Sequence, residues 1–132
     1  MKYLLDTNIC IYIIKKKPLS VFEKIQLLQI NDIGISAITL AELEYGVSKS
    51  SSFERNKIAL LKFIAPLVIL PFTEKAAKTY GQLRAFLEKT GQIIGILDLF
   101  IGSHAKSENL ILVTNNVFEF SRIPELEIEN WV

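Results

Sequence analysis

Three acidic side chains occupy comparable positions in three separate parts of the sequence. Asp6 directly follows the apolar run KYLL, Glu42 lies in the first turn of an expected helix after the run DIGIS, and Asp98 lies near the start of the expected helix ILDLFIGSHAKSE. Carboxylates that lie close together without a cation repel one another, and a bound divalent metal ion would relieve this repulsion. All-oxygen ligands favour Mg²⁺ or Mn²⁺, which assist reactions of phosphate esters. We therefore interpret the three acids as candidate metal ligands.

Each acid also has a local explanation when it is taken singly. Asp6 is a good helix N-cap residue, and an acid at Asp98 would favour the positive end of a helix dipole. Thr39 and Glu42 have the spacing of a capping box, in which the glutamate returns to a backbone N–H. Asp98, however, is flanked by apolar residues, and no Lys or Arg lies at helical spacing from it. A partly buried carboxylate needs a partner, which favours the metal site.

Small polar residues beside the acids are candidate supporting groups. Thr7 and Asn8 are expected to orient Asp6 through hydrogen bonds. The run TNN, which contains Thr114 and Asn116, repeats the same polar chemistry after a later apolar run. A simple turn is the alternative explanation for TNN.

Short apolar runs alternate with helical patterns along the chain. We expect strands at KYLL, DIGIS, LVIL and LILV, and a short edge strand at EIENW. Between them we expect helices over residues 9–16, from 18 onward, and over 40–49, 55–64, 73–91 and 96–108. Short, wholly apolar strands of this kind predict a parallel sheet covered on both faces. Ligands bind outside the carboxyl ends of such strands, so the three acids should meet there.

Length and composition exclude several classes of protein. A chain of 132 residues predicts one domain over residues 1–132, and its half share of hydrophobic residues excludes a disordered chain. No apolar stretch reaches the roughly eighteen residues of a membrane span, and the N-terminus lacks a secretion signal. Cys10, the only cysteine, excludes an internal disulfide and is expected to fill the core. We expect a cytoplasmic protein without a membrane partner.

Other catalytic chemistries have little support. His104, the only histidine, lies six residues after Asp98, about 120° around a helix. Its imidazole should point away from that carboxylate and be solvated or bonded structurally. The chain has no phosphate-binding glycine loop and no Gly-x-Ser-x-Gly motif. With a net charge of +1, its groups of Lys and Arg fit solvated helix faces.

Four segments together resemble the VapC family, the PIN-domain ribonuclease toxins of bacterial toxin–antitoxin pairs. They run in order through the chain: YLLDTNICIYIIKKKP, ISAITLAELEYGV, IIGILDLFIGSHAKSENLILVTNN and FSRIPELEIENW. The resemblance implies a PIN domain, a three-layer α/β/α sandwich around a short, mainly parallel sheet. It also implies that Asp6, Glu42 and Asp98 are the family's acidic residues, which bind Mg²⁺ or Mn²⁺.

The same resemblance implies a function. The protein would be a metal-dependent endoribonuclease that hydrolyses RNA phosphodiester bonds, leaving a 5′-phosphate and a 3′-hydroxyl. It would act as a growth-inhibiting toxin, usually as a homodimer, neutralised by a VapB-type antitoxin. The chain is most similar to members that cut initiator tRNA in the anticodon stem-loop. Two alternatives stay open: a catalytically inactive PIN module that binds RNA or a protein, and a nuclease that acts on DNA.

One position departs from the family pattern. Many PIN domains carry a fourth acid where this chain has Asn116, and an amide orients water without adding negative charge. Binding of one metal ion or two is therefore left open. Glu119, three residues further on, could reach the same region or lie in an exposed turn. Asn116 and Glu119 complete the predicted catalytic residues, with Thr7 and Thr114 as supporting hydroxyls.

Overall fold

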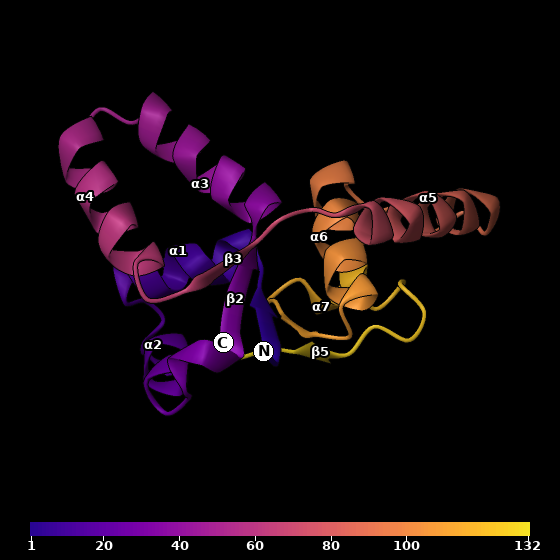
Figure 1. The fold of residues 1–132 in the computed structure, drawn as a ribbon, viewed down its shortest axis with the longest axis horizontal. Coiled ribbons are helices and arrows are strands. Elements are labelled where there is room, and N and C mark those ends of the chain that lie inside the picture. The colour runs from indigo at the N-terminus through magenta and orange to yellow at the C-terminus, as the bar shows by residue number, and fades with distance from the viewer.

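A five-stranded parallel sheet forms the centre of the protein in a computed structural model that describes residues 1–132 (Figure 1). The strands are β1 (Tyr3–Leu5), β2 (Ile33–Ser36), β3 (Val68–Leu70), β4 (Ile111–Val113) and β5 (Ile128–Glu129). Their order in the sheet is β3-β2-β1-β4-β5, and every neighbouring pair is parallel. Leu5 of the central strand lies opposite Ile35 on one side and Val113 on the other. The prediction of a parallel sheet is confirmed.

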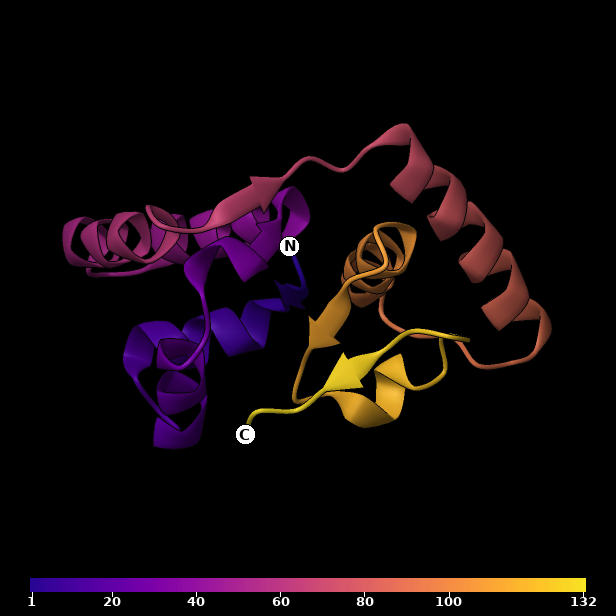
Figure 2. The ribbon, with the colours of Figure 1, turned by 60° about the horizontal axis from the view of Figure 1, so that its bottom comes forward.

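Helices cover both faces of this sheet. They are α1 (Thr7–Lys15), α2 (Leu19–Gln26), α3 (Ala37–Lys49), α4 (Phe53–Ile64), α5 (Glu74–Lys89), α6 (Ile96–Ser107) and α7 (Val117–Phe120), with one 3-10 turn (Ile30–Asp32) before β2. The first four lie on one face and the last three on the other (Figure 2). This arrangement confirms the three-layer α/β/α sandwich.

The alternation of side chains along β1 creates two separate cores. Tyr3 and Leu5 point into the core formed with α1 to α4, whereas Leu4 points into the core formed with α5, α6 and α7. Successive residues of a strand face opposite sides, so three consecutive apolar residues serve both layers. Cys10 is fully buried in the first core, as predicted. No helix of the protein is long and apolar enough to cross a membrane.

Helix starts differ from the sequence prediction in informative ways. The first helix begins at Thr7, two residues early, because Asp6 caps it. Pro18 is the N-cap of α2 and not part of its first turn. The third helix begins at Ala37, three residues early, because the Ser36 side chain accepts a hydrogen bond from the N–H of Ile38.

Two further elements were mispredicted or missed. The run LVIL was expected to be covered on both faces, but β3 is an edge strand whose Val68 and Ile69 side chains are exposed. The short helix α7, from Val117 to Phe120, was not predicted. Its four residues are too few to show a helical repeat in the sequence.

Candidate active site

The acids predicted from the sequence lie around the carboxyl edge of the sheet. Asp6 follows β1, Glu42 lies on α3 after β2, and Glu119 lies on α7 after β4. Asp98 comes from the first turn of α6. The charges of Asp6, Glu42 and Glu119 each raise the pKa of Asp98. The fold therefore brings four acids from distant parts of the chain into one region.

Asp6 both caps a helix and lies among the acids of the candidate site, which are the two roles that the sequence left open. Its Oδ1 accepts a hydrogen bond of 2.9 Å from the N–H of Ile9 and so caps α1. Its Oδ2 accepts a hydrogen bond of 2.5 Å from the hydroxyl of Thr114. The side chain is buried, and this burial raises its pKa, with a smaller contribution from the charge of Glu42. The hydrogen bonds offset part of that rise.

A second threonine holds Glu42. The hydroxyl of Thr7 donates a hydrogen bond of 2.7 Å to Oε1 of Glu42. The sequence predicts that Thr7 and Asn8 orient Asp6, and the structure differs for Thr7 only, since the backbone N–H of Asn8 does hydrogen-bond to Asp6 and lowers its pKa. Thr7 contacts Glu42 instead, and Asn8 is exposed with no hydrogen bond from its side chain. Thr114 performs the role that the sequence assigned to Thr7.

The capping box considered as the alternative role of Thr39 and Glu42 does not form, and the prediction that Glu42 lies in the first turn of its helix is wrong. Ser36 caps α3, so Glu42 lies in the second turn of the helix and its carboxylate turns to Thr7. The hydroxyl of Thr39 is buried and has no hydrogen-bond partner. The Glu42 carboxylate is therefore not used in a capping box and is available for the candidate site.

Asp98 has the most perturbed carboxyl group of the site. Its pKa rises from 3.8 to about 6, mainly through burial, and then through the charges of Glu119, Asp6 and Glu42. The side chain is partly buried, as predicted. The two salt bridges of the structure, Lys57–Glu44 and Arg84–Glu88, involve none of these acids. The Asp98 carboxylate therefore forms no salt bridge with a Lys or Arg side chain.

Hydrogen bonds donated by Asn116 link it to Glu119 and to Asp98. The Asn116 amide donates to Oε2 of Glu119 at 2.9 Å and lies 3.5 Å from Oδ2 of Asp98. Its backbone N–H donates to the Thr114 hydroxyl, which in turn donates to Asp6. An acid at this position would add a fifth charge, whereas the amide links the existing carboxylates.

Glu119 also anchors the start of α6. Its Oε1 accepts a hydrogen bond of 2.5 Å from the N–H of Gly95, the N-cap residue, which has no side chain of its own to cap the helix. This bond lowers the pKa of Glu119, with further contributions from Asn116 and the charge of Arg122. Sequence analysis missed this contact, because it joins residues 24 positions apart.

Close packing fixes the other side of α6. A Cβ atom at Gly102 would lie 2.5 Å from Cδ1 of Ile123 and 3.3 Å from the Phe120 ring. A larger residue at this position would therefore require the buried Ile123 side chain to shift.

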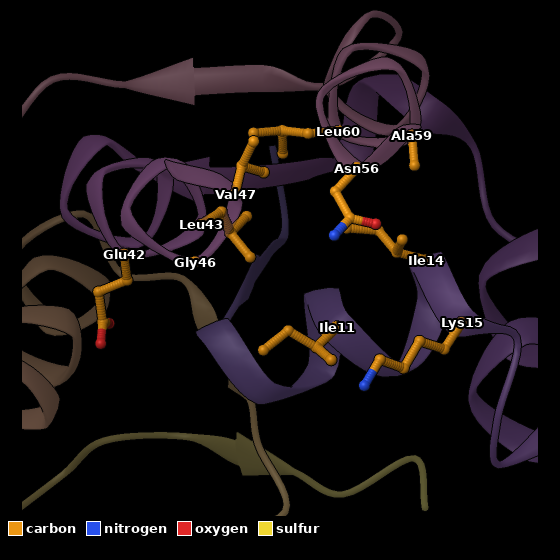
Figure 3. Close-up of a pocket in the computed structure, with 10 residues that line it drawn as sticks. All are labelled: Ile11, Ile14, Lys15, Glu42, Leu43, Gly46, Val47, Asn56, Ala59 and Leu60. Atoms are coloured by element: carbon orange, nitrogen blue, oxygen red, sulfur yellow. The ribbon is translucent and has the colours of Figure 1, made fainter. Parts of the chain in front are cut away.

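An apolar groove runs away from Glu42 between α1, α3 and α4. Figure 3 shows the Glu42 carboxylate at one end of it, with Ile11 and Ile14 below and Leu60 above. The groove has a volume of about 240 Å³. The groove could not be predicted from the sequence, because its lining comes from three helices that only the tertiary fold brings together.

The donor set fits a hard divalent cation. It offers carboxylate, amide and hydroxyl oxygens and no sulfur or imidazole, which is the ligand chemistry of Mg²⁺ and Mn²⁺. No three Asp, Glu, His or Cys side chains lie close enough together to form a ready-made metal cluster. This spacing suits an ion that keeps several waters and takes one or two carboxylates, as Mg²⁺ commonly does.

The fold is that of a known class of protein. The PIN domain pattern matches residues 3–126. The chain is 53% identical to the Ribonuclease VapC2 of Rickettsia felis over 132 residues, covering 99% of this chain and 98% of the relative. It is 44% identical over 131 residues to a protein of Shigella flexneri named tRNA(fMet)-specific endonuclease VapC, with 99% and 98% covered.

A solved structure shares the whole fold. The crystal structure of VapBC2 from Rickettsia felis, bound to a DNA fragment from their promoter, contains a chain that matches this one with a TM-score of 0.94. The two chains are 52% identical, and the match covers 100% of each. The chain therefore belongs to the PIN-domain family and, within it, to the VapC ribonucleases.

Proposed function

We propose that this protein is a metal-dependent endoribonuclease toxin of a type II toxin–antitoxin pair. One observation carries the proposal: four carboxylates lie around the carboxyl edge of the sheet without a salt bridge, and burial together with the charges of the other three acids raises the pKa of Asp98 to about 6. Such an arrangement costs stability and is typical of a functional site. Asp6, Glu42 and Asp98 are all present in the chain, which favours an active enzyme over a catalytically inactive module.

Asp6, Glu42 and Asp98 would hold Mg²⁺ or Mn²⁺. A bound ion of this kind polarises a phosphoryl oxygen, activates water and stabilises the leaving oxygen. The charges of the three acids already act on one another, since Glu42 raises the pKa of Asp6 and both raise the pKa of Asp98. A cation would relieve this repulsion, which supports the assignment.

The remaining residues would place these acids and the substrate water. Thr114 fixes one oxygen of Asp6, and Thr7 fixes one oxygen of Glu42. The Asn116 amide, between Glu119 and Asp98, is placed to orient a water by hydrogen bonding. Glu119 is held by the N–H of Gly95 and keeps Asn116 in position.

The proposed substrate is tRNA, with the anticodon stem-loop of initiator tRNA as the specific target. The name of the Shigella flexneri relative, which is 44% identical, supports this substrate. Sequence-specific RNA recognition favours unpaired bases in loops, which can be splayed out and contacted individually. An anticodon loop offers such bases.

A VapB-type antitoxin is the proposed protein partner, and the VapBC complex of Rickettsia felis supports it. The apolar groove beside Glu42 would receive a C-terminal segment of that antitoxin (Figure 3). We also propose a homodimer, supported by exposed apolar side chains such as Tyr45, Ile58 and Leu61 on α3 and α4. Sedimentation of the free chain tests the dimer.

A cleavage assay tests the proposed activity. Purified, antitoxin-free protein is incubated with total tRNA and with a matched DNA strand, in Mg²⁺ or Mn²⁺ and in EDTA. Discrete tRNA fragments that need both the metal and Asp98 are the expected result, and mapping of their ends identifies the target. Folded protein that cleaves neither nucleic acid would contradict the proposal and favour the binding-module alternative.

A further inference from the structure

A buried hydrogen bond joins α6 to the start of α3 behind the candidate active site. Nδ1 of His104 lies 2.8 Å from Oγ of Ser36, and the two residues are 1% and 0% exposed. The sequence predicted that His104 faces away from Asp98 and is solvated or structurally bonded, and the structural bond is what the structure contains. None of the candidate site residues contacts this pair by a hydrogen bond.

The hydrogen bond between Ser36 and His104 is compatible with a neutral imidazole. Ser36 Oγ accepts a bond of 3.1 Å from the N–H of Ile38, which leaves its own hydrogen available for Nδ1 of a neutral imidazole. Burial lowers the pKa of His104, in keeping with a neutral ring. The ring is also packed edge-on against Phe72 at a centroid distance of 5.4 Å. The imidazole is therefore held in one orientation.

The pair lies at a matched distance from two of the candidate ligands. His104 follows Asp98 by six residues on α6, and Glu42 follows Ser36 by six residues. At a rise of 1.5 Å per residue, each separation is about 9 Å along its helix. A shift of either helix at the hydrogen bond would thus move one carboxylate relative to the other.

We propose that Ser36 and His104 form a positioning pair that sets the separation of Glu42 and Asp98 for binding of a divalent cation. The proposal rests on the proposed function, because it needs a metal site at these acids. Groups that orient metal ligands through hydrogen bonds typically change metal affinity by about 10- to 100-fold when they are removed. Ser36 and His104 act at greater distance, so the lower end of this range is expected.

Two neighbouring hydroxyls show that burial alone does not create such a bond. The side chains of Ser103, next to His104, and Thr39, three residues after Ser36, are fully buried, but neither hydroxyl has a partner. They offer matched controls. Ser103→Ala removes an equally buried hydroxyl from the same helix without breaking a hydrogen bond.

The test measures Mn²⁺ affinity by titration calorimetry on the full chain, with no RNA present. His104→Asn keeps a polar atom near the place of Nδ1, whereas His104→Gln places its amide near that of Nε2. We expect His104→Gln and Ser36→Ala to weaken Mn²⁺ binding about 10-fold, and His104→Asn and Ser103→Ala to bind as the wild type does. Circular dichroism confirms that each variant is folded.

A double variant separates positioning from general destabilisation. If the two side chains act through one bond, Ser36→Ala/His104→Gln should bind Mn²⁺ no more weakly than the weaker single variant. Folded single variants with wild-type Mn²⁺ affinity would overturn the positioning role while leaving the metal site intact. If the wild-type protein binds Mn²⁺ no better than the Asp98→Asn variant does, both the proposed function and this inference are overturned.

Discussion

The hydroxyl of Thr7 donates a 2.7 Å hydrogen bond to Oε1 of Glu42, 35 residues further along the chain. This bond joins the first turn of α1 to the second turn of α3. A comparable bond joins Thr114, after β4, to Asp6, after β1. Two threonines thus orient two of the acids across neighbouring segments, and the geometry of the site depends on tertiary contacts between short polar side chains.

Thr7→Val should lower RNA cleavage by about 10-fold, because Glu42 would lose the hydroxyl that orients it. Valine keeps the shape of threonine, so the thermal unfolding temperature should change little. Initial cleavage rates at saturating Mn²⁺ measure the effect. Thr7→Ser, which keeps the hydroxyl, is the matched control and should retain activity. Equal rates for valine and serine variants would remove Thr7 from the site.

Asp98→Asn should abolish cleavage while leaving the fold intact, since it removes charge at the metal site but little volume. The same change should stabilise the metal-free protein at pH 7.5, because it removes a partly buried charge repelled by three other acids. After allowance for solvent screening, we expect a gain of about 1 to 2 kcal/mol in the free energy of unfolding. Urea unfolding in EDTA measures this gain, and a loss of stability would contradict the electrostatic account.

The stability of the metal-free protein should depend on pH through Asp98. Its folded pKa of about 6 lies above its ordinary value of 3.8. The contribution of Asp98 to the free energy of unfolding is therefore fully present below pH 3.8, and it is lost as the pH rises through about 6. The lowered pKa of His104 acts in the opposite direction, since its unfolded state binds more protons.

Comparison with Asp98→Asn isolates the contribution of Asp98. The advantage of this variant over the wild type should grow by roughly 1 kcal/mol between pH 5 and pH 7.5. Urea unfolding of both proteins in EDTA at the two pH values gives the difference. An advantage that stays constant over this range would show that the pKa of Asp98 is not raised.

Asn116→Ala should weaken cleavage less than Asp6→Ala. The amide of Asn116 donates to Glu119 and lies near Asp98, but it adds no charge for a cation, whereas Asp6 is a proposed ligand. Single-turnover rates of both variants at saturating Mn²⁺ give the ranking. The reverse order would place the metal nearer to Asn116 than to Asp6.

The fold could largely be predicted from the sequence because its signals are local. Apolar runs such as KYLL mark buried strands, and the alternation with helices indicates the parallel sheet. The sequence placed Glu42 near Asp6 and Asp98, and its charge raises the pKa of both. Its hydrogen bond with Thr7 was not predicted, because that contact depends on how α1 and α3 cross. The predicted starts of α1 and α3 lie two and three residues after the observed ones, because the capping residues Asp6 and Ser36 precede the apolar repeat.

Contacts between distant segments account for most of what the sequence did not predict. The bond from Gly95 to Glu119 and the pair of Ser36 and His104 each join two chain segments whose relative positions come only from packing. The apolar groove beside Glu42 is of the same kind. Residue type indicated which side chains could act, and the tertiary structure decides which of them meet.

The most direct test of the metal site is a crystal structure of the free chain soaked with Mn²⁺, with anomalous scattering used to locate the ion. We expect an ion at the carboxyl edge of the sheet, coordinated by Asp6 and Asp98, with Glu42 contacting the ion or one of its waters. The anomalous peak of this ion should be absent from crystals of Asp98→Asn. A peak elsewhere on the surface, or none at saturating Mn²⁺, would contradict the assignment of these acids as metal ligands.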